Sequence, residues 1–518
     1  MLSFCSIAAF RLLALPRPFH YDDEATGTFY GVLARNYLRF GLTRTHGIPV
    51  ETVGEPPNGS LFYYPDHPPL VPLLIASLYL LFGVGEWQTR LPTSIATVAA
   101  TYVLYLLMKR YATDRAALLG AILFAAMPMN LYFGGQPEVV GMPLVLFVLM
   151  LVGAYLALHE QPNARRLLLL SGALIFAGLS DWPAFLMVPI LAVHWAATKP
   201  RHQWSWMVIF GAAACALFAL LVGYIAWATN ARVTWMMPLF MRRAALGAAA
   251  PFTAGQWLTT AWSFNRHLHT LPILVAAALW VVLDACGARA SRGQSRIPTL
   301  ESRLARILLA WGVLHVLIGR QGVFNHEWWW WPLTPGLAVA AALLIDRLRT
   351  AAERIGFSRI AHASLVLLVV VFAAWTTITS WRELFARQAD VLTPMVLGRA
   401  IRAAAPRSSD VALLTWSGSD PQLWFYGDRP LRANVWSIDD LTRRINDETV
   451  DMMFDEEQPW KGTATALVFP AQFRDLRELS GYLQRTYALV PLPADLAQTF
   501  DVFDLRRPLI SEPSPHRP

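Results

Sequence analysis

Charged residues and cysteines are scarce in this sequence. Only 15% of its 518 residues are Asp, Glu, Lys or Arg, whereas 55% are hydrophobic. Soluble domains carry about 25% charged residues, so the composition excludes an ordinary soluble protein and predicts a membrane protein with many spans. The three cysteines, Cys5, Cys215 and Cys286, lie within or at the ends of apolar segments. Their odd number leaves no complete disulfide framework.

Apolar segments recur over the first three quarters of the chain. Because crossing the hydrocarbon takes about 20 residues, residues 70–82 are too short to span it and predict a helix in the membrane interface. Residues 2–15 are also short, but no small-residue cleavage site follows them, which favours a first transmembrane helix over a signal peptide. Whether the sequence begins at the true start is left open. We expect eleven spans, near residues 2–15, 91–108, 116–133, 139–158, 167–180, 183–198, 204–228, 268–285, 307–319, 328–345 and 361–380.

Every second loop between these spans is rich in Lys and Arg. The positive-inside rule assigns such loops to the cytoplasm, which also explains the net charge of +8. The basic residues are Lys109, Arg110, Arg115, Arg165, Arg166, Lys199, Arg201, Arg289, Arg292, Arg296, Arg303, Arg306, Arg347, Arg349, Arg354 and Arg359. The loops on the outer side are then residues 17–67, residues 134–138, the Asp181-Trp182 turn, residues 229–267 and residues 320–327.

The composition changes to that of a soluble domain after the last span. We expect residues 1–382 to form a transmembrane domain, with residues 17–90 as its first outer loop and interfacial helices, and residues 383–518 to form a small extracytoplasmic α/β domain. A helical pattern covers residues 473–483. Short apolar runs predict strands at residues 411–415, 466–469, 487–490 and 500–505.

Four polar clusters are expected on the outer side of the membrane. Carboxylates there can take a proton from an acceptor or bind a divalent cation, and Arg and His can bind a phosphate. Together they predict a site that transfers a group from a membrane-anchored phosphate donor. Taken singly, each cluster is also explained as solvated charge, a helix N-terminus or an aromatic belt. The clusters are Asp22-Asp23-Glu24, Asp66-His67, Gln136-Pro137-Glu138, and Arg320 with His326-Glu327.

Motifs around these clusters occur in an order that resembles a known family. They are Asp23-Glu24 with Ala34-Arg35-Asn36-Tyr37-Leu38-Arg39-Phe40-Gly41; Tyr64-Pro65-Asp66-His67-Pro68-Pro69-Leu70; Arg90-Leu91-Pro92; Pro128-Met129-Asn130-Leu131-Tyr132-Phe133 with Glu138; and His326-Glu327-Trp328-Trp329-Trp330-Trp331-Pro332-Leu333-Thr334-Pro335. Over residues 1 to about 380 the chain resembles GT-C glycosyltransferases, in the group of protein O-mannosyltransferases, the aminoarabinose transferase of lipid A and rhizobial lipopolysaccharide galacturonosyltransferases.

The resemblance implies a GT-C-like fold, a polyprenyl-phosphate sugar donor and an inverting displacement at the periplasmic or luminal face. Asp23 would be the catalytic base, and Glu24 and Glu138 would orient the acceptor or bind a metal. Whether a divalent cation is a cofactor is left open. The acceptor would be a cell-envelope glycolipid, lipopolysaccharide, glycan or protein, and no nucleic acid is expected. In a bacterium, the membrane that carries such a protein is the inner membrane. The residues expected to bind substrate are Arg35, Asp66, His67, Arg320, His326 and Glu327.

This sequence departs from the family pattern at two of these positions. His67 stands where the family commonly has a lysine, so a phosphate contact there depends on protonation of the ring. Glu138 stands where an aspartate is usual, without the usual preceding arginine. Each departure leaves the implied reaction class in place and changes the chemistry of one contact.

Two other functions are compatible with the sequence. A transporter or flippase of lipid-linked sugars would bind substrate without bond chemistry, but no internal repeat is visible and the charges lie at loop ends rather than near the bilayer midplane. A non-catalytic family member would bind a lipid-linked sugar only. Neither sugar nor acceptor can be read from the sequence, and their contacts are expected from the terminal domain and from residues 229–267, including Arg242, Arg243, Asn265, Arg266 and His267.

Overall fold

The computed structural model divides into two compact units. It describes residues 12–19, 25–56, 59–138, 140–230, 238, 240–244, 252–290, 300–386, 392–416, 421–451 and 457–509. The first unit comprises Met1–Pro16, Pro65–Leu74 and Arg90–Phe385, and the second comprises Arg17–Tyr64, Ile75–Thr89 and Ala386–Pro518. Most of the first outer loop therefore groups with the C-terminal domain, whereas the sequence places it with the transmembrane domain.

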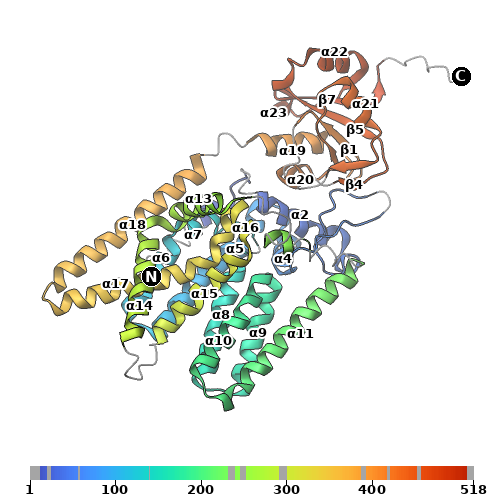
Figure 1. Cartoon of the computed structure of the whole chain (residues 1–518). Coiled ribbons are helices and arrows are strands. Elements are labelled where there is room, and N and C mark those ends of the chain that lie inside the picture. Colours follow the sequence, from blue (N-terminus) through green and yellow to red (C-terminus); the bar gives the residue numbers. More distant parts are fainter. Residues whose placement is uncertain are drawn as a thin grey trace. The chain divides into compact units, whose positions relative to one another are not determined.

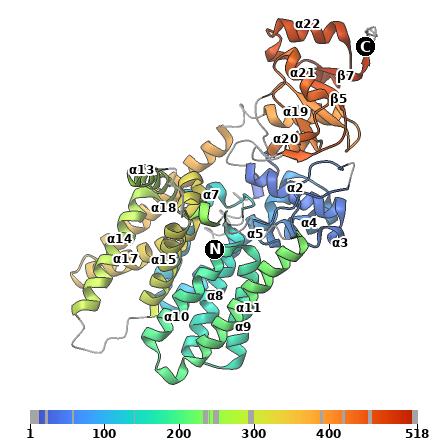
Figure 2. The ribbon, with the colours of Figure 1, turned by 45° about the vertical axis from the view of Figure 1, so that its right-hand side comes forward.

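The first unit is a bundle of helices. Figures 1 and 2 show α8, α9, α10 and α11 packed side by side, and α17 lies against α6, α14 and α15. Each span expected after residue 90 coincides with one or two helices. The helices are α5 (Glu86–Tyr111), α6 (Asp114–Ala126), α7 (Pro128–Phe133), α8 (Met142–Glu160), α9 (Ala164–Ser180), η2 (Trp182–Leu186), α10 (Met187–Thr198), η3 (Arg201–Gln203), α11 (Ser205–Ala228), α13 (Ala254–Asn265), η4 (Arg266–Thr270), α14 (Leu271–Ala290), α15 (Leu300–Ile318), α16 (Arg320–Asn325), η5 (Glu327–Leu333), α17 (Thr334–Arg354) and α18 (Ser358–Ala386).

Six described segments are long and apolar enough to cross a membrane by length and composition. The helix α4 (Leu70–Phe82) has the bounds expected from the sequence, and its 13 residues fall short of a span. The first expected span lies mostly outside the described residues. The six segments are Glu86–Tyr111, Met142–Glu160, Arg201–Ala228, Ala254–Cys286, Glu327–Arg354 and His362–Ser380.

Short polar caps separate the helices of the bundle. Thr113 caps α6 by accepting a hydrogen bond from the amide of Ala116, and Asn163 caps α9 through the amide of Arg166. The side chain of Asp181 accepts from the amide of Trp182 where α9 ends and η2 begins. These side chains satisfy amides that have no partner within the first turn of a helix, so the chain reverses within a few residues.

The second unit contains a mixed seven-stranded sheet with the order β4-β3-β2-β1-β5-β7-β6. Strands β2, β1 and β5 are parallel, and the other neighbours are antiparallel. Helices cover both faces: α21 and α22 share an apolar core with one face, and α19 contacts β5 and β7. The elements are α2 (Ala25–Phe40), α3 (Leu42–Thr45), α19 (Leu392–Ala404), β1 (Val411–Leu414), α20 (Pro421–Gly427), β2 (Leu431–Arg432), α21 (Ile438–Ile445), β3 (Thr449–Asp451), β4 (Glu457–Pro459), β5 (Ala464–Pro470), η7 (Ala471–Phe473), α22 (Arg477–Thr486), β6 (Tyr487–Leu489), α23 (Ala494–Ala497) and β7 (Phe500–Pro508).

Three of these strands have no signal in the sequence. β2, β3 and β4 are only two or three residues long, and β2 contains Arg432, a residue type that argues against a buried strand. Arg432 is nevertheless fully buried, because its guanidinium donates to carbonyl oxygens that include those of Thr449, Ile445 and Gly462. Hydrogen bonding therefore offsets the desolvation of its charge.

Candidate functional site

His67 and Asp181 form a buried pair in the first unit. His67 Nδ1 lies 2.8 Å from Asp181 Oδ1, and the two side chains are 15% and 1% exposed. The indole N–H of Trp182 donates to the carbonyl oxygen of Asp66 at 2.7 Å, so the same turn also holds the backbone before His67. These contacts join the loop before α4 to the turn between α9 and η2.

The pair sets the charge of the histidine. Burial disfavours the imidazolium, but the charge and hydrogen bond of Asp181, helped by Asp66 and Glu138, raise the pKa of His67 above its usual value. Burial raises the pKa of Asp66, with His67, Arg243 and Arg242 opposing this. The cluster thus brings together residues from four loops that the sequence assigns to one side of the membrane.

Arg243 extends this cluster towards the residues before α17. Its Nη1 donates to His326 Nε2 at 3.3 Å, and its guanidinium lies 5.4 Å from the ring centroid of Trp329. Burial and Arg243 together lower the pKa of His326 to about 4. The ring is therefore neutral at neutral pH and accepts a hydrogen bond, so it orients Arg243 and adds no positive charge of its own. A neutral ring still carries an Nδ1–H that can donate, so the contact of His326 with the donor phosphate stays a prediction.

Arg320 and Glu327 lie at the starts of α16 and η5 in the same unit. Arg320 Nη2 donates to the carbonyl oxygen of Ala244 at 3.2 Å, beside Arg243 in the chain, and its own carbonyl accepts from Trp257 at 3.1 Å. Glu327 is half-buried. The structure thus brings Arg320 next to the segment that carries Arg243.

Glu138 is buried in a loop that the tryptophan run supports. Trp331 Nε1 donates to Asn130 Oδ1 at 2.6 Å, and the ring of Phe133 lies 6.2 Å from that of Trp331. A Cβ at Gly141 would lie 2.7 Å from the Trp331 ring, so the residue there must be small. Trp331 is fully buried, so this part of the run is interior packing and not a membrane-interface belt.

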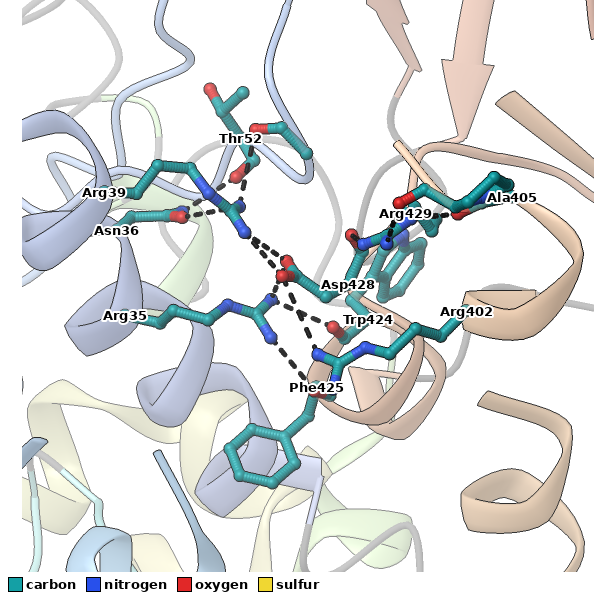
Figure 3. A network of polar contacts seen from close by, with 12 residues as sticks. Arg35, Asn36, Arg39, Thr52, Arg402, Ala405, Trp424, Phe425, Asp428 and Arg429 are labelled. Atoms are coloured by element: carbon teal, nitrogen blue, oxygen red, sulfur yellow. Dashed lines mark hydrogen bonds and ion pairs between the residues drawn. The ribbon is translucent and has the colours of Figure 1, made fainter. Parts of the chain in front are cut away.

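The other predicted residues lie outside the described part of the chain or in the second unit. Asp23 and Glu24 lie outside the described residues. Arg35 belongs to the second unit, where its Nη2 lies 2.8 Å from Asp428 Oδ1. Its Nη1 and Nη2 also donate to the carbonyl oxygens of Phe425 and Trp424, respectively (Figure 3). These contacts give the guanidinium a structural role within the second unit, and its contact with a donor phosphate stays a prediction.

Sequence reasoning missed the importance of two residues. The sequence marks Asp181 only as part of a turn expected on the outer side, because Asp is common at the ends of helices. Arg243 was one of several basic residues in a long loop. The signal for both was their expected location on the same side as His67, but only packing shows which of them meet.

The structure is similar to solved glycosyltransferases over nearly its full length. It matches ArnT from Cupriavidus metallidurans bound to undecaprenyl phosphate with a TM-score of 0.60 and 15% identity, covering 96% of this chain and 97% of that chain. It matches the archaeal oligosaccharyltransferase AglB from Archaeoglobus fulgidus, in complex with an inhibitory peptide and a dolichol-phosphate, with a TM-score of 0.55 and 13% identity, covering 94% of this chain and 72% of that chain. The chain has the GT-C fold. This confirms the resemblance and the predicted class, a polytopic helical membrane protein with a small C-terminal α/β domain.

One family model also matches part of the chain. Its description is dolichyl-phosphate-mannose-protein mannosyltransferase, and it covers residues 66–227. Within the GT-C fold this range contains Asp66, His67, Glu138 and Asp181. Among curated proteins, no sequence matches the chain significantly.

The described residues contain no group of three or more His, Cys, Asp or Glu side chains placed to hold a metal ion. The Asp22-Asp23-Glu24 stretch lies outside them, so a divalent cation there stays a prediction. In the first unit, the positive charges of His67 and Arg243 act on the carboxyl group of Asp66, and the charge of Glu138 acts on His67. Such an arrangement can bind a phosphate beside groups that orient an acceptor.

Proposed function

We propose that this chain is a membrane glycosyltransferase that moves a sugar from a polyprenyl-phosphate donor to a cell-envelope acceptor. The observation that carries the proposal is the joint occurrence of the GT-C fold and the His67-Asp181 pair with Arg243 in one bundle. A transporter needs no such fixed pairing of a cation with a carboxylate at loop ends. The periplasmic face of the bacterial inner membrane is the proposed location, supported by the basic loops on the opposite side.

His67 binds the donor phosphate as an imidazolium in this proposal. Asp181 accepts from Nδ1 and fixes the ring, so the imidazolium carries its positive charge in a set orientation towards a donor phosphate. A charge-assisted hydrogen bond of this kind is about twice as strong as a neutral one. The raised pKa of His67 keeps more of the ring charged near neutral pH than an ordinary histidine would have.

Arg243 supplies the second positive charge. Its neutral partners, the ring of His326 and the face of Trp329, hold the guanidinium without neutralising it. Arg320 supports the same segment through the carbonyl of Ala244. Two fixed cations favour a polyprenyl phosphate as the leaving group, since they stabilise the negative charge that develops on its oxygen.

The reaction is a single inverting displacement. An oxygen or nitrogen of the acceptor attacks the anomeric carbon as the bond between that carbon and the phosphate oxygen breaks, and polyprenyl phosphate leaves. Asp23 takes the proton of the acceptor, and Glu24 and Glu138 orient the acceptor. General-base catalysis of this kind contributes about 100- to 10,000-fold to the rate.

Purified protein tests this proposal directly. The protein is mixed with a polyprenyl-phosphate sugar and an envelope lipid and glycan fraction, and the release of polyprenyl phosphate is measured. Wild type should release it, and Asp23→Asn should lower the rate by about 100-fold or more. Reconstituted vesicles that move the lipid across the bilayer without releasing polyprenyl phosphate would instead identify a transporter. Full activity of Asp23→Asn would falsify Asp23 as the base.

A further inference from the structure

Asp428 is the centre of a buried cluster of arginines in the second unit. Arg35 Nη2 lies 2.8 Å from Asp428 Oδ1, and Arg39 Nη2 lies 2.7 Å from Oδ1 and 2.5 Å from Oδ2. Figure 3 shows both guanidinium groups, from successive turns of α2, pointing at this one carboxylate beyond the end of α20. Arg402 of α19 adds a third cation at 3.8 Å.

The cluster is charged throughout. Burial lowers the pKa of Arg35 to about 10, which leaves it protonated at neutral pH. Burial alone would raise the pKa of Asp428, but Arg35 and Arg39 outweigh it and the pKa is lowered. Removing the carboxylate would therefore leave buried positive charge without its counter-ion, which is the costly way to break an ion pair.

Asp428 itself is held rigidly. Its φ of 54° is unusual for a residue other than glycine, and its amide donates to the carbonyl of Trp424 at 3.0 Å. The next residue, Arg429, donates to the carbonyl of Pro406 at 2.9 Å, just beyond α19. The carboxylate is thus presented to α2 from a segment tied to the α/β domain.

The residues before Asp428 contact the chain on both sides of the acidic stretch. On one side, the amide of Phe19 donates to the hydroxyl of Tyr426 at 2.8 Å, and the Phe19 ring meets that of Phe425 edge to face at 5.3 Å. On the other side, a Cβ at Gly31 of α2 would lie only 2.5 Å from the Phe425 ring. Helix α20 and Asp428 therefore hold the residue that precedes residues 20–24 and the helix that follows them.

We propose that Asp428 is a positioning residue for transfer and that Tyr426 assists it by holding Phe19. Asp428 acts through Arg35 and Arg39, which hold α2, the helix that follows Asp23 and Glu24 in the chain. The soluble C-terminal domain would then be a required part of the catalytic machinery without touching the substrate. This inference rests on the proposed function.

Two variants and a matched control test the proposal in the full-length protein. Asp428→Asn removes the charge at nearly constant volume. Tyr426→Phe removes only the hydroxyl that links Phe19 and Glu86, so it stays informative if the first variant folds poorly. The control is Asp447→Asn, which breaks a comparable pair with Arg444 at 3.0 Å between α21 and β3.

Two readouts separate positioning from stability. We expect Asp428→Asn and Tyr426→Phe to lower kcat by about tenfold or more with the donor KM changed less than about twofold, because donor contacts are retained while geometry is lost. Hydrogen exchange of the amides of α2 should accelerate by about tenfold or more in Asp428→Asn. Asp447→Asn should leave both quantities within about twofold of wild type.

The outcomes are distinct. Unchanged hydrogen exchange of α2 in Asp428→Asn, or equal losses of kcat in the control at equal thermal stability, would overturn the positioning role. Absence of transfer by the wild type would instead refute the proposed function, and hydrogen exchange would still decide whether Asp428 holds α2.

Discussion

Replacing Asp181 by Asn tests how the site binds phosphate. The change removes the negative charge 2.8 Å from His67 Nδ1 but keeps an oxygen that can accept from the ring and from the amide of Trp182. Burial of the ring still lowers the pKa of His67, and the charge of Asp181 no longer opposes this effect. The pKa of His67 therefore falls, and the imidazolium that we assign to the donor phosphate is lost at lower pH.

The size of the effect follows from the contact that is lost. Two unit charges at this distance attract by roughly 6 kcal/mol at an effective dielectric constant of about 20, before desolvation is subtracted. The net value of a hydrogen bond to a charged group is about 1.5–3 kcal/mol, so kcat/KM at neutral pH should fall by about 10- to 150-fold. The loss should be shared between the donor KM and kcat, because the phosphate is bound in the ground state and gains negative charge in the transition state.

The raised pKa of His67 also determines the direction in which the pH profile of activity should move. The raised folded pKa of His67 means that its contribution to stability is complete below the unfolded pKa of about 6.5 and is lost as the pH rises through the folded value. Activity that needs the imidazolium declines over the same range. The alkaline limb of the kcat/KM profile should therefore move to lower pH in Asp181→Asn.

A matched control is Asp284→Asn, which removes a carboxylate paired with Arg306 at 2.6 Å in the same unit. Initial rates of polyprenyl phosphate release from pH 5 to pH 9 measure both variants. The control should keep the wild-type profile. An alkaline limb in Asp181→Asn that coincides with wild type, at equal kcat/KM, would refute the role assigned to the pair.

Two further predictions concern the same cluster. Glu138→Gln should lower kcat by about tenfold or more, because the neutral amide oxygen is a weaker acceptor for the proton-donating group than the carboxylate. Glu160→Gln, at an exposed pair, should stay within about twofold. Single-turnover rates measure both, and equal rates would remove Glu138 from the site. Arg243→Met should raise the donor KM by about tenfold through loss of a charged contact, and Arg242→Met by less. Equal donor affinities for these two variants in a binding titration would show that Arg243 has no special role.

The arrangement of the bundle was largely predictable from the sequence. Long apolar segments predict helices, and the distribution of Lys and Arg among the loops indicates which loops share a side. The loops that carry Asp66, Glu138 and Asp181, which are expected on one side, lie near one another in the first unit. Alternation of loop charge is enough for this inference, since each span reverses the side of the chain.

The contacts within the clusters were not predictable. Whether His67 pairs with Asp181 or with Glu138 depends on how the helices pack, which periodicity does not encode. Arg35 illustrates the same limit, because its partner Asp428 lies near the other end of the sequence and no local pattern links them. The short strands around Arg432 were missed because buried hydrogen bonds override the propensity of a charged residue.

The most direct test of the central claim is mass spectrometry of envelope lipids, glycans and proteins from cells that express the wild type, Asp23→Asn or no protein. The proposed transfer predicts that one envelope component lacks a sugar in the last two strains while the polyprenyl-phosphate-linked sugar, its donor, accumulates. Identical envelope components in all three strains, with no accumulated carrier, would contradict the assignment of this chain as a glycosyltransferase.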